Sequence, residues 1–439
     1  MNFVFFLLFI FFLIYSYKST VYSFSLLLLL FLITPPTIAI PVSLFGIGII
    51  FSLPRLYFLS FILVFLMKLL IKKTRLKIVR SSDDIILLLY IIYTIISLSW
   101  GLDLNFDLKI LFSEQYLLAF LTYFIAANII NKVDQIKVLF KYLFVALIFL
   151  SIYGFIEMIF QTTISNFPLI RAIAGFNIDD SDFISKSIGD RGGFARVSGT
   201  FWNNIIYGIA LTLFFPFFLR SGKVFKGSIF RFSIYFSTIA GLLTISRTAW
   251  FSMIYALGLN FKKHKVLFVI VLIALFTFLL PFLRFDFIKT KYIDTSGVSI
   301  ASRIVVLSPV FNDLSTKEIF WGLGVGSYLY SNINKVSTTN IERLPSDNSF
   351  AQRVFTNGLI GVILFILFFY LYYRNISPKA KNIEPISFGI TKATSQMLLI
   401  QLTLFFVSNS LFQDPRLSFV FFSVLGAVKG VVSNKNLIK

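Results

Sequence analysis

The sequence predicts an all-α polytopic membrane protein with about 12 to 14 transmembrane helices and a large outer loop. Of its 439 residues, 57% are hydrophobic and only 13% are charged. Runs such as 266–283 and 358–373 contain no charged residue at all. Backbone polar groups in lipid need partners within their own segment, which selects helices, and these runs lack the period-two alternation of barrel strands. Together these observations point to many apolar helices in one chain.

The basic residues are unevenly distributed along the chain. Lys and Arg number 40 against 19 Asp and Glu, for a net charge of +21. More than half of them fall in six clusters, at 72–80, 132–141, 220–231, 262–265, 374–392 and 429–439. Such asymmetry between loops is typical of the positive-inside rule, so we expect these clusters to face the cytoplasm. The excess charge then orients the protein and contacts membrane lipids, and we predict no nucleic-acid partner.

The clusters separate the predicted spans in order. From Arg80 onward, spans are expected near 84–101, 110–130, 138–160, 198–219, 229–245, 248–261, 266–283, 354–373, 394–412 and 417–433, which places the C-terminus in the cytoplasm. Residues 3–17, 21–34 and 56–71 are also predicted to span. The segment 35–54 is apolar but contains four prolines. It either crosses the membrane, giving about 14 spans, or dips in and returns, giving about 13.

Two outer segments are unusually long and polar. We predict an N-terminal transmembrane bundle over 1–283 with an outer loop at 161–197, a large periplasmic loop over 284–353, and C-terminal transmembrane helices over 354–439. Long loops on a rigid scaffold usually contain the functional residues of a protein. The chain has no cysteine, which excludes disulfides, thiolate catalysis and cysteine-based metal sites.

The first polar constellation is "DRGGFARVSGTFWNN", which holds Arg191, Arg196 and Asn203. Its glycines let the backbone turn closely before the next span, with Ser198 or Thr200 as the expected helix cap. Arg196 should then lie at or just below the outer interface. The alternative is an interfacial arginine that only extends its charge toward water.

The second constellation is "TISRTAW", which holds Arg247. The apolar run 230–261, of about 32 residues, is too long for one span and short for two, so we predict two shortened helices that meet at 246–248. Each arm would be about 24 Å long, less than a hydrocarbon core of ~30 Å, so Arg247 should lie in a recess. A charge at membrane depth costs about 3 kcal/mol or more and normally faces a cavity and a partner. The alternative is an internal salt bridge, for example to Glu157 or Glu114.

The third constellation is "SRIVVLSPVFNDLSTKEIFWGLGVGSYLY". Arg303 opens a predicted amphipathic helix, "GLGVG" predicts a tight turn, and Tyr328 follows. No βαβ unit surrounds these glycines, so they do not indicate a dinucleotide site. The alternative is a loop that only packs on the helices.

The fourth constellation is "RLPSDNSFAQRVFTNGLIG". Asp347 and Asn348 precede a span whose start contains Arg353. An acid at that position is favoured by the helix dipole, so Asp347 could serve only as a cap. As a base, its carboxylate could accept the proton of a sugar hydroxyl.

These constellations are all predicted on one membrane face, beside a cavity. Arginine forks suit phosphate oxygens, while asparagines and tyrosines suit sugar hydroxyls. Such a surface would bind a lipid-linked diphosphate sugar whose tail lies in the bilayer. The acids "DDSD" at 179–182 could hold a cation, but we expect a solvated loop there. We therefore predict neither a metal nor a cofactor.

The ordered set of motifs resembles the O-antigen polymerase and ligase superfamily. "RVSGTFWNN" resembles its Arg-x-Ser-Gly-Thr-Phe-x-Asn motif, and "TISRTAW" its Thr-x-Ser-Arg-x-Ala/Gly helix junction. "SRIVVL…GLGVGSY" and "DNSFAQRVFTNGLIG" resemble its large periplasmic loop and the start of the next span. Order, spacing and sidedness agree across residues 84–433. The resemblance implies an all-helical membrane transferase of the GT-C-like class, with its active site in the large outer loop.

The resemblance also implies roles for individual residues. Arg196, Arg247 and Arg303 match arginines thought to contact the lipid diphosphate, with Arg247 also stabilising charge in catalysis. Asp347 and Asn348 fall where the ligases have His-Asn, and the acid in place of histidine favours the polymerase (Wzy-type) branch with Asp347 as its base. The remaining predicted substrate-binding residues are Asn203, Asn348, Arg191 and Tyr328.

The implied activity is synthesis of a bacterial surface polysaccharide, O-antigen or capsule. The enzyme would transfer the growing glycan from undecaprenyl diphosphate to the non-reducing end of the next lipid-linked repeat unit. It would lie in the bacterial inner membrane with its site facing the periplasm, and the family implies a chain-length regulator and a flippase as partners. The alternatives are an O-antigen ligase, which transfers glycan to lipid A core, and a flippase for lipid-linked oligosaccharides.

Overall fold

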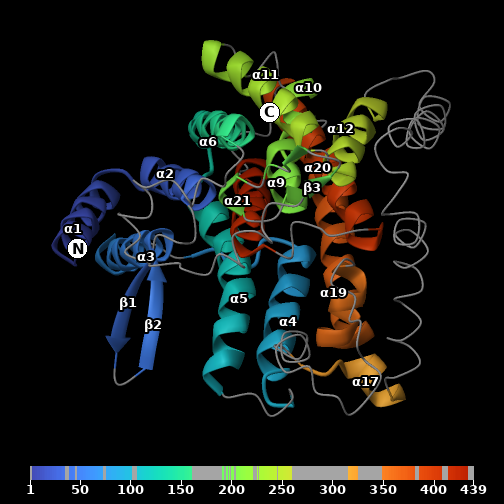
Figure 1. Cartoon of the computed structure of the whole chain (residues 1–439). Helices are drawn as coiled ribbons and strands as arrows, with labels where there is room; N and C mark the ends of the chain where they lie inside the picture. Colours follow the sequence, from blue (N-terminus) through green and yellow to red (C-terminus); the bar gives the residue numbers. More distant parts are fainter. Residues whose placement is uncertain are drawn as a thin grey trace.

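The computed structural model describes residues 2–34, 39–44, 47–72, 76–100, 106–160, 190–191, 194–195, 197, 199–201, 204–220, 225, 227–244, 246–259, 315–324, 349–380, 385–407 and 414–433. The helices of this part are α1 (Asn2–Lys18), α2 (Thr20–Ile33), α3 (Leu53–Lys72), α4 (Ser82–Ile96), α5 (Phe106–Ile129), α6 (Val133–Phe160), the 3-10 turn η2 (Gly199–Phe201), α9 (Asn204–Thr212), α10 (Phe215–Arg220), α11 (Ser228–Leu243), α12 (Arg247–Gly258), α17 (Thr316–Trp321), α19 (Ser349–Ala380), α20 (Pro385–Val407) and α21 (Pro415–Val432). Figure 1 shows their arrangement.

The helical class predicted from the sequence is confirmed, and several helices could cross a membrane. Within the described residues, four helices are long and apolar enough to do so: Pro54–Ile71, Val133–Phe160, Gln352–Ser377 and Pro415–Val432. Shorter apolar helices occur at Phe9–Lys18, Thr20–Ile33, Leu117–Ile129, Ile205–Arg220 and Ser228–Leu243. The total number of spans stays a prediction, and the expected span at 266–283 lies outside the described residues.

The segment between α2 and α3 differs from the helices around it. Its described parts, β1 (Ala39–Leu44) and β2 (Ile47–Ser52), form an antiparallel hairpin, with Ala39 opposite Ser52 and Leu44 opposite Ile47. The chain therefore turns back, as in the second of the two predicted alternatives, but as strands. Pro41 has no amide proton to donate within a helix, and the isoleucines and valine of the segment favour extended backbone.

The span predicted at 198–219 is broken into three pieces. Gly199–Phe201 forms η2, and α9 is followed by a separate α10. Pro216 lies in the first turn of α10, where its missing N–H breaks the continuity of helical hydrogen bonds. A second short hairpin, β3 (Asp190–Arg191) with β4 (Phe194–Ala195), precedes this region.

The predicted junction near 246–248 is confirmed. The helix α11 ends at Leu243 and α12 begins at Arg247, so two short helices replace one long span. Ser246 is the N-cap of α12, and its Oγ accepts a hydrogen bond from the Ala249 amide at 3.5 Å. Hydroxyl side chains stabilise helix starts because they satisfy amides that have no partner within the helix.

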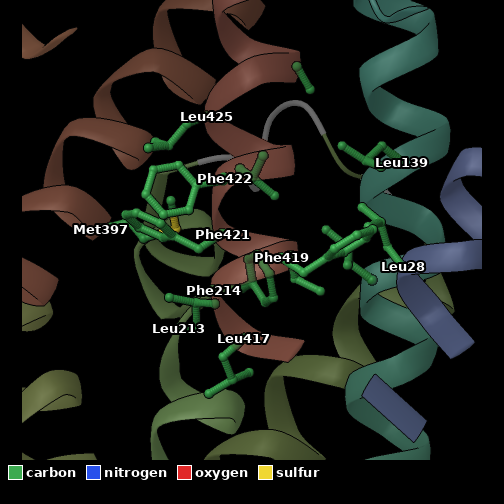
Figure 2. Close-up of a cluster of buried hydrophobic side chains, with 14 of the residues drawn as sticks. Leu28, Leu139, Leu213, Phe214, Met397, Leu417, Phe419, Phe421, Phe422 and Leu425 are labelled. Atoms are coloured by element: carbon green, nitrogen blue, oxygen red, sulfur yellow. The ribbon is translucent and has the colours of Figure 1, made fainter. Parts of the chain in front are cut away.

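The helix α21 lies at the centre of the core. It contacts α2, α5, α6, α19 and α20, and 89% of its span is buried inside the protein. Figure 2 shows its side chains, among them Phe419, Phe421 and Phe422, packed against Leu28 of α2, Leu139 of α6 and Met397 of α20. Tight packing of aromatic and aliphatic side chains is the main source of helix association where water does not drive it.

A buried ion pair marks one end of this bundle. The Lys429 Nζ lies 2.7 Å from the Asp83 Oδ2, with side chains 2% and 0% exposed respectively. Asn375 of α19 donates to Asp83, and the Tyr123 hydroxyl donates to Asp84 at 2.8 Å. The pair thus ties the first turn of α4 to the last turns of α21 and to the later half of α19.

Candidate functional site

The candidate site lies at the opposite end of the same helices. On α21, Arg416 is separated from Lys429 by about 20 Å along the helix axis. On α4, Asp83 is in the first turn and Tyr93 near the last. Described parts of the first, third and fourth motifs contact this second end through Arg416 and Tyr93.

The first motif is fixed through its turn η2. The Gly199 amide donates to Glu157 Oε2 of α6 at 2.8 Å, and the Thr200 hydroxyl donates to the Leu32 carbonyl of α2 at 2.9 Å. Gly199 has a φ of +55°, a left-handed conformation that glycine adopts without steric cost. Thr200 lies within η2, and Ser198, the other residue expected as a cap, lies outside the described residues, so the predicted cap stays a prediction.

An arginine at the start of α21 also contacts this turn. Arg416 Nη1 donates to the Thr200 carbonyl at 2.8 Å, and its guanidinium lies 4.2 Å from the centre of the Phe201 ring. Asp414 pairs with the same guanidinium, with Nη2 to Oδ2 at 2.9 Å. The turn between two helices is therefore held from three directions, by α2, α6 and α21.

The first and second motifs are neighbours in space. Tyr207 of α9 packs against Gly154 and Gly199, and its hydroxyl donates to the Leu150 carbonyl at 2.6 Å. On the next residue, Gly208, a Cβ would lie 2.8 Å from the Ala249 Cβ and 3.2 Å from the Ser246 Cβ. The short helix α9 thus bridges the "RVSGTF" turn and the start of α12, where Arg247 lies.

The third and fourth motifs are also neighbours. After α17, the Leu323 and Gly324 amides donate to the carbonyls of Phe355 and Thr356 at 2.8 and 3.0 Å. The helix α19 is broken at Gly358, whose φ is +64°. A helix break leaves some carbonyl groups without a hydrogen-bond partner in the helix. The Leu323 and Gly324 amides, in the glycine turn of the third motif, donate to two such carbonyls. Figure 1 shows α17 beside one end of α19.

Polar side chains from α4 and α19 face one another beside this break. The Tyr93 hydroxyl donates to the carbonyls of Trp321 and Asn357 at 2.9 and 2.8 Å. Arg353 is 7% exposed, and its Nη1 donates to the Tyr90 hydroxyl at 3.1 Å. The Asn357 Nδ2 is buried and has no hydrogen-bond partner among the described residues. A buried guanidinium and a buried amide thus lie on one face of α19.

Most of the predicted site side chains lie outside the described residues. These are Arg196, Asn203, Arg303, Tyr328, Asp347 and Asn348. The backbone of Arg191 belongs to β3 and that of Arg247 begins α12, but their side chains also lie outside the described part. The structure therefore brings together the segments of the first two motifs, and separately those of the last two. The roles of the residues stay predictions.

Several residues of this region were not predicted from the sequence. Glu157, considered from the sequence only as a partner for Arg247, accepts the Gly199 amide. The predicted pairing with Arg247 stays a prediction, because the Arg247 side chain lies outside the described part. Asp414 and Arg416 lie in "QDPRLSF", where aspartate followed by proline is a recognisable helix start: the Asp414 side chain accepts from the Arg416 and Leu417 amides. That signal predicts the cap but not the contact with a turn more than 200 residues earlier.

The fold and this region define a helical protein with several potential membrane spans and a polar cluster at one end. Across the residues that the structure describes, no group of three or more His, Asp or Glu residues could hold a metal ion. No family model matches the chain, and no curated protein matches it.

Proposed function

We propose that this protein is a polymerase of bacterial surface polysaccharide. One observation supports the proposal most directly: α9 bridges the turn next to Arg196 and the helix start at Arg247. Two arginines from separate segments are thus attached to one small structural unit at one end of the bundle. Paired guanidinium groups fit the oxygens of a diphosphate better than a single charge does. The GT-C-like class of the fold is part of this proposal.

The proposed reaction is a glycosyl transfer between two lipid-linked substrates. A hydroxyl at the non-reducing end of the incoming repeat unit attacks the anomeric carbon of the growing glycan. A new C–O bond forms, and the bond to the diphosphate breaks with its electron pair leaving on undecaprenyl diphosphate. Asp347 accepts the hydroxyl proton, while Arg196, Arg247 and Arg303 stabilise the charge on the leaving diphosphate. The donor is already activated by its diphosphate.

The proposed orientation places this site on the outer face. Lys77, Arg80, Lys132 and Lys137 lie at the other end of the helices, where α4 and α6 begin, in the segments that the positive-inside rule assigns to the cytoplasm. We therefore propose a multi-pass protein of the bacterial inner membrane, with a cytoplasmic C-terminus and a periplasmic site. Its lipid-linked substrate would arrive from a flippase, and a chain-length regulator would act beside it.

The test is a reconstituted reaction. The purified protein is placed in liposomes with undecaprenyl-diphosphate-linked repeat units, and the products are separated by length. We expect a ladder of longer glycans, and loss of that ladder in Arg247→Ala with normal insertion in the membrane. Lys137→Ala, which removes a partly exposed basic residue at the other end, is the control and should retain the ladder. Long glycan made by Arg247→Ala would refute the role of this arginine.

The same reaction separates the alternatives. Transfer of glycan to added lipid A core, without lengthening of the lipid-linked donor, would identify a ligase. Movement of the oligosaccharide across the bilayer without any new bond would identify a flippase. Either outcome would refute the polymerase proposal.

A further inference from the structure

We infer that Asp414 and Arg416 are positioning residues for the diphosphate site, because they fix the turn η2, which lies between Arg196 and Asn203 in the sequence. This inference rests on the proposed function for its substrate, but not for its geometry. Thr200 and Phe201, the two residues that Arg416 contacts, stand between these two predicted binding residues in the sequence.

Each nitrogen of the Arg416 guanidinium donates a hydrogen bond within the protein. Its Nη1 donates to the Thr200 carbonyl at 2.8 Å, its Nη2 to Asp414 Oδ2 at 2.9 Å and its Nε to Asp414 Oδ1 at 3.3 Å. The Phe201 ring covers one face at 4.2 Å. The side chain is 14% exposed. Through these contacts Arg416 holds the turn, so we assign it a positioning role.

Asp414 connects this contact to the helix behind it. Its Oδ1 accepts from the Arg416 and Leu417 amides at 2.8 and 3.2 Å, so the same carboxylate caps α21 and holds the guanidinium. Because α21 is the central helix of the core, the turn is fixed relative to the most buried of the four candidate spans in the described residues. A bidentate pair fixes direction as well as distance, which a lysine ammonium does not.

Two variants isolate this function. Arg416→Lys keeps the charge but loses the planar fork, and Asp414→Asn keeps a good helix cap but loses the charge that orients the guanidinium. A reacting group displaced by ~1 Å can slow catalysis by about 100-fold. In the reconstituted reaction we expect kcat/KM to fall by about 10- to 100-fold in both variants.

A readout independent of activity is hydrogen exchange at the turn. We expect the amides of the turn, including the Gly199 amide that donates to Glu157, to exchange at least about 10-fold faster in Arg416→Lys and Asp414→Asn than in the wild type. The control is Lys429→Met, which breaks the other buried ion pair of α21 at its far end. This control should lower thermal stability while leaving kcat/KM per folded protein and exchange at the turn within about 2-fold.

The outcomes separate the inference from the proposed function. The positioning role would be overturned if Arg416→Lys matched Lys429→Met both in the hydrogen-exchange rates of the turn amides and in kcat/KM. Arg416 would then contribute only stability. A wild-type protein that does not lengthen glycans would overturn the proposed function. In that case the exchange measurement still decides whether Asp414 and Arg416 hold the turn.

Discussion

At the scale of single residues, the ion pair between Asp83 and Lys429 is the most fully buried charge contact among the described residues. Its carboxylate also accepts from Asn375, Ser81 and Tyr123. Burial of two charges has a large desolvation cost, which close pairing and additional hydrogen bonds offset. The pair therefore specifies which helix ends meet, because either charge alone would be unstable in this position.

We predict that Lys429→Met destabilises the protein by about 3–5 kcal/mol, because it leaves the Asp83 carboxylate buried without its counter-charge. The double variant Lys429→Met with Asp83→Asn should recover more than half of that loss, since neither position is then charged. Thermal unfolding in detergent measures both. Equal stability of the single and double variants would contradict this account of the ion pair.

At the scale of helices, glycines decide how closely α5 and α21 approach. A Cβ at Gly426 would overlap the Tyr123 carbonyl of α5, and one at Gly430 would lie 2.6 Å from the Ala127 carbonyl. Backbone atoms cannot rotate away as side chains do, so any larger residue must separate the two helices. Small residues four apart are typical of close helix contacts in membranes.

We predict that Gly426→Ala destabilises the protein by about 1–3 kcal/mol through this overlap. The matched control is Gly241→Ala in α11, where a Cβ would first meet Thr212 Cγ2 at 3.4 Å, an ordinary contact. Alanine also favours helix over glycine, so this control should be neutral or stabilising. Thermal unfolding of the two variants compares them directly, and a similar loss in both would count against the packing argument.

The break in α19 supports a third prediction. Gly358 and Gly322 both have positive φ, and a Cβ on Gly358 would overlap the Phe320 carbonyl. We expect Gly358→Ala to detach the 320–324 segment from α19, and Tyr93→Phe to weaken the same contact by about 1–3 kcal/mol, because two carbonyls lose their hydroxyl donor. Hydrogen exchange at the Leu323 and Gly324 amides should accelerate in both variants. Unchanged exchange would show that the segment is held by other contacts.

Helices that coincide with long apolar runs were predictable from the sequence, whereas the contacts between helices were not. The junction at Ser246–Arg247 follows from the length of one apolar run and a capping serine. The hairpin at Ala39–Ser52 was missed as strands because short apolar runs do not distinguish helix from strand. Within the candidate site, the motifs were visible, but the Arg416–Thr200 contact joins segments too distant for any single-sequence pattern to connect.

At the scale of the whole molecule, two ends of the bundle differ in chemistry. One end contains the exposed lysines and the start of α6, and the other contains Trp100 and Trp321 beside Tyr93, with ring centres of the two tryptophans 6.0 Å apart. Aromatic side chains of this kind gather at membrane surfaces, while lysines and arginines favour the cytoplasmic side. The distribution of lysines between the two ends supports the proposed orientation in a membrane.

Because the chain contains no cysteine, single cysteines can test this orientation directly. We predict that Thr316→Cys on α17 reacts with a membrane-impermeant maleimide in intact cells, because the proposed orientation places that end outside. Asp134→Cys, whose parent side chain is 89% exposed at the other end, should react only after the membrane is opened. Reaction of Asp134→Cys in intact cells would reverse the proposed topology.

The central place of α21 has a consequence for biogenesis. The ribosome makes this helix after every other described helix, yet five of them pack around it. In the proposed membrane protein the earlier helices lack these contacts until α21 enters, so we expect them to associate only loosely before that. Insertion of α21 would therefore complete the packing of the helices. We expect chains truncated before α21 to be degraded by cellular quality control.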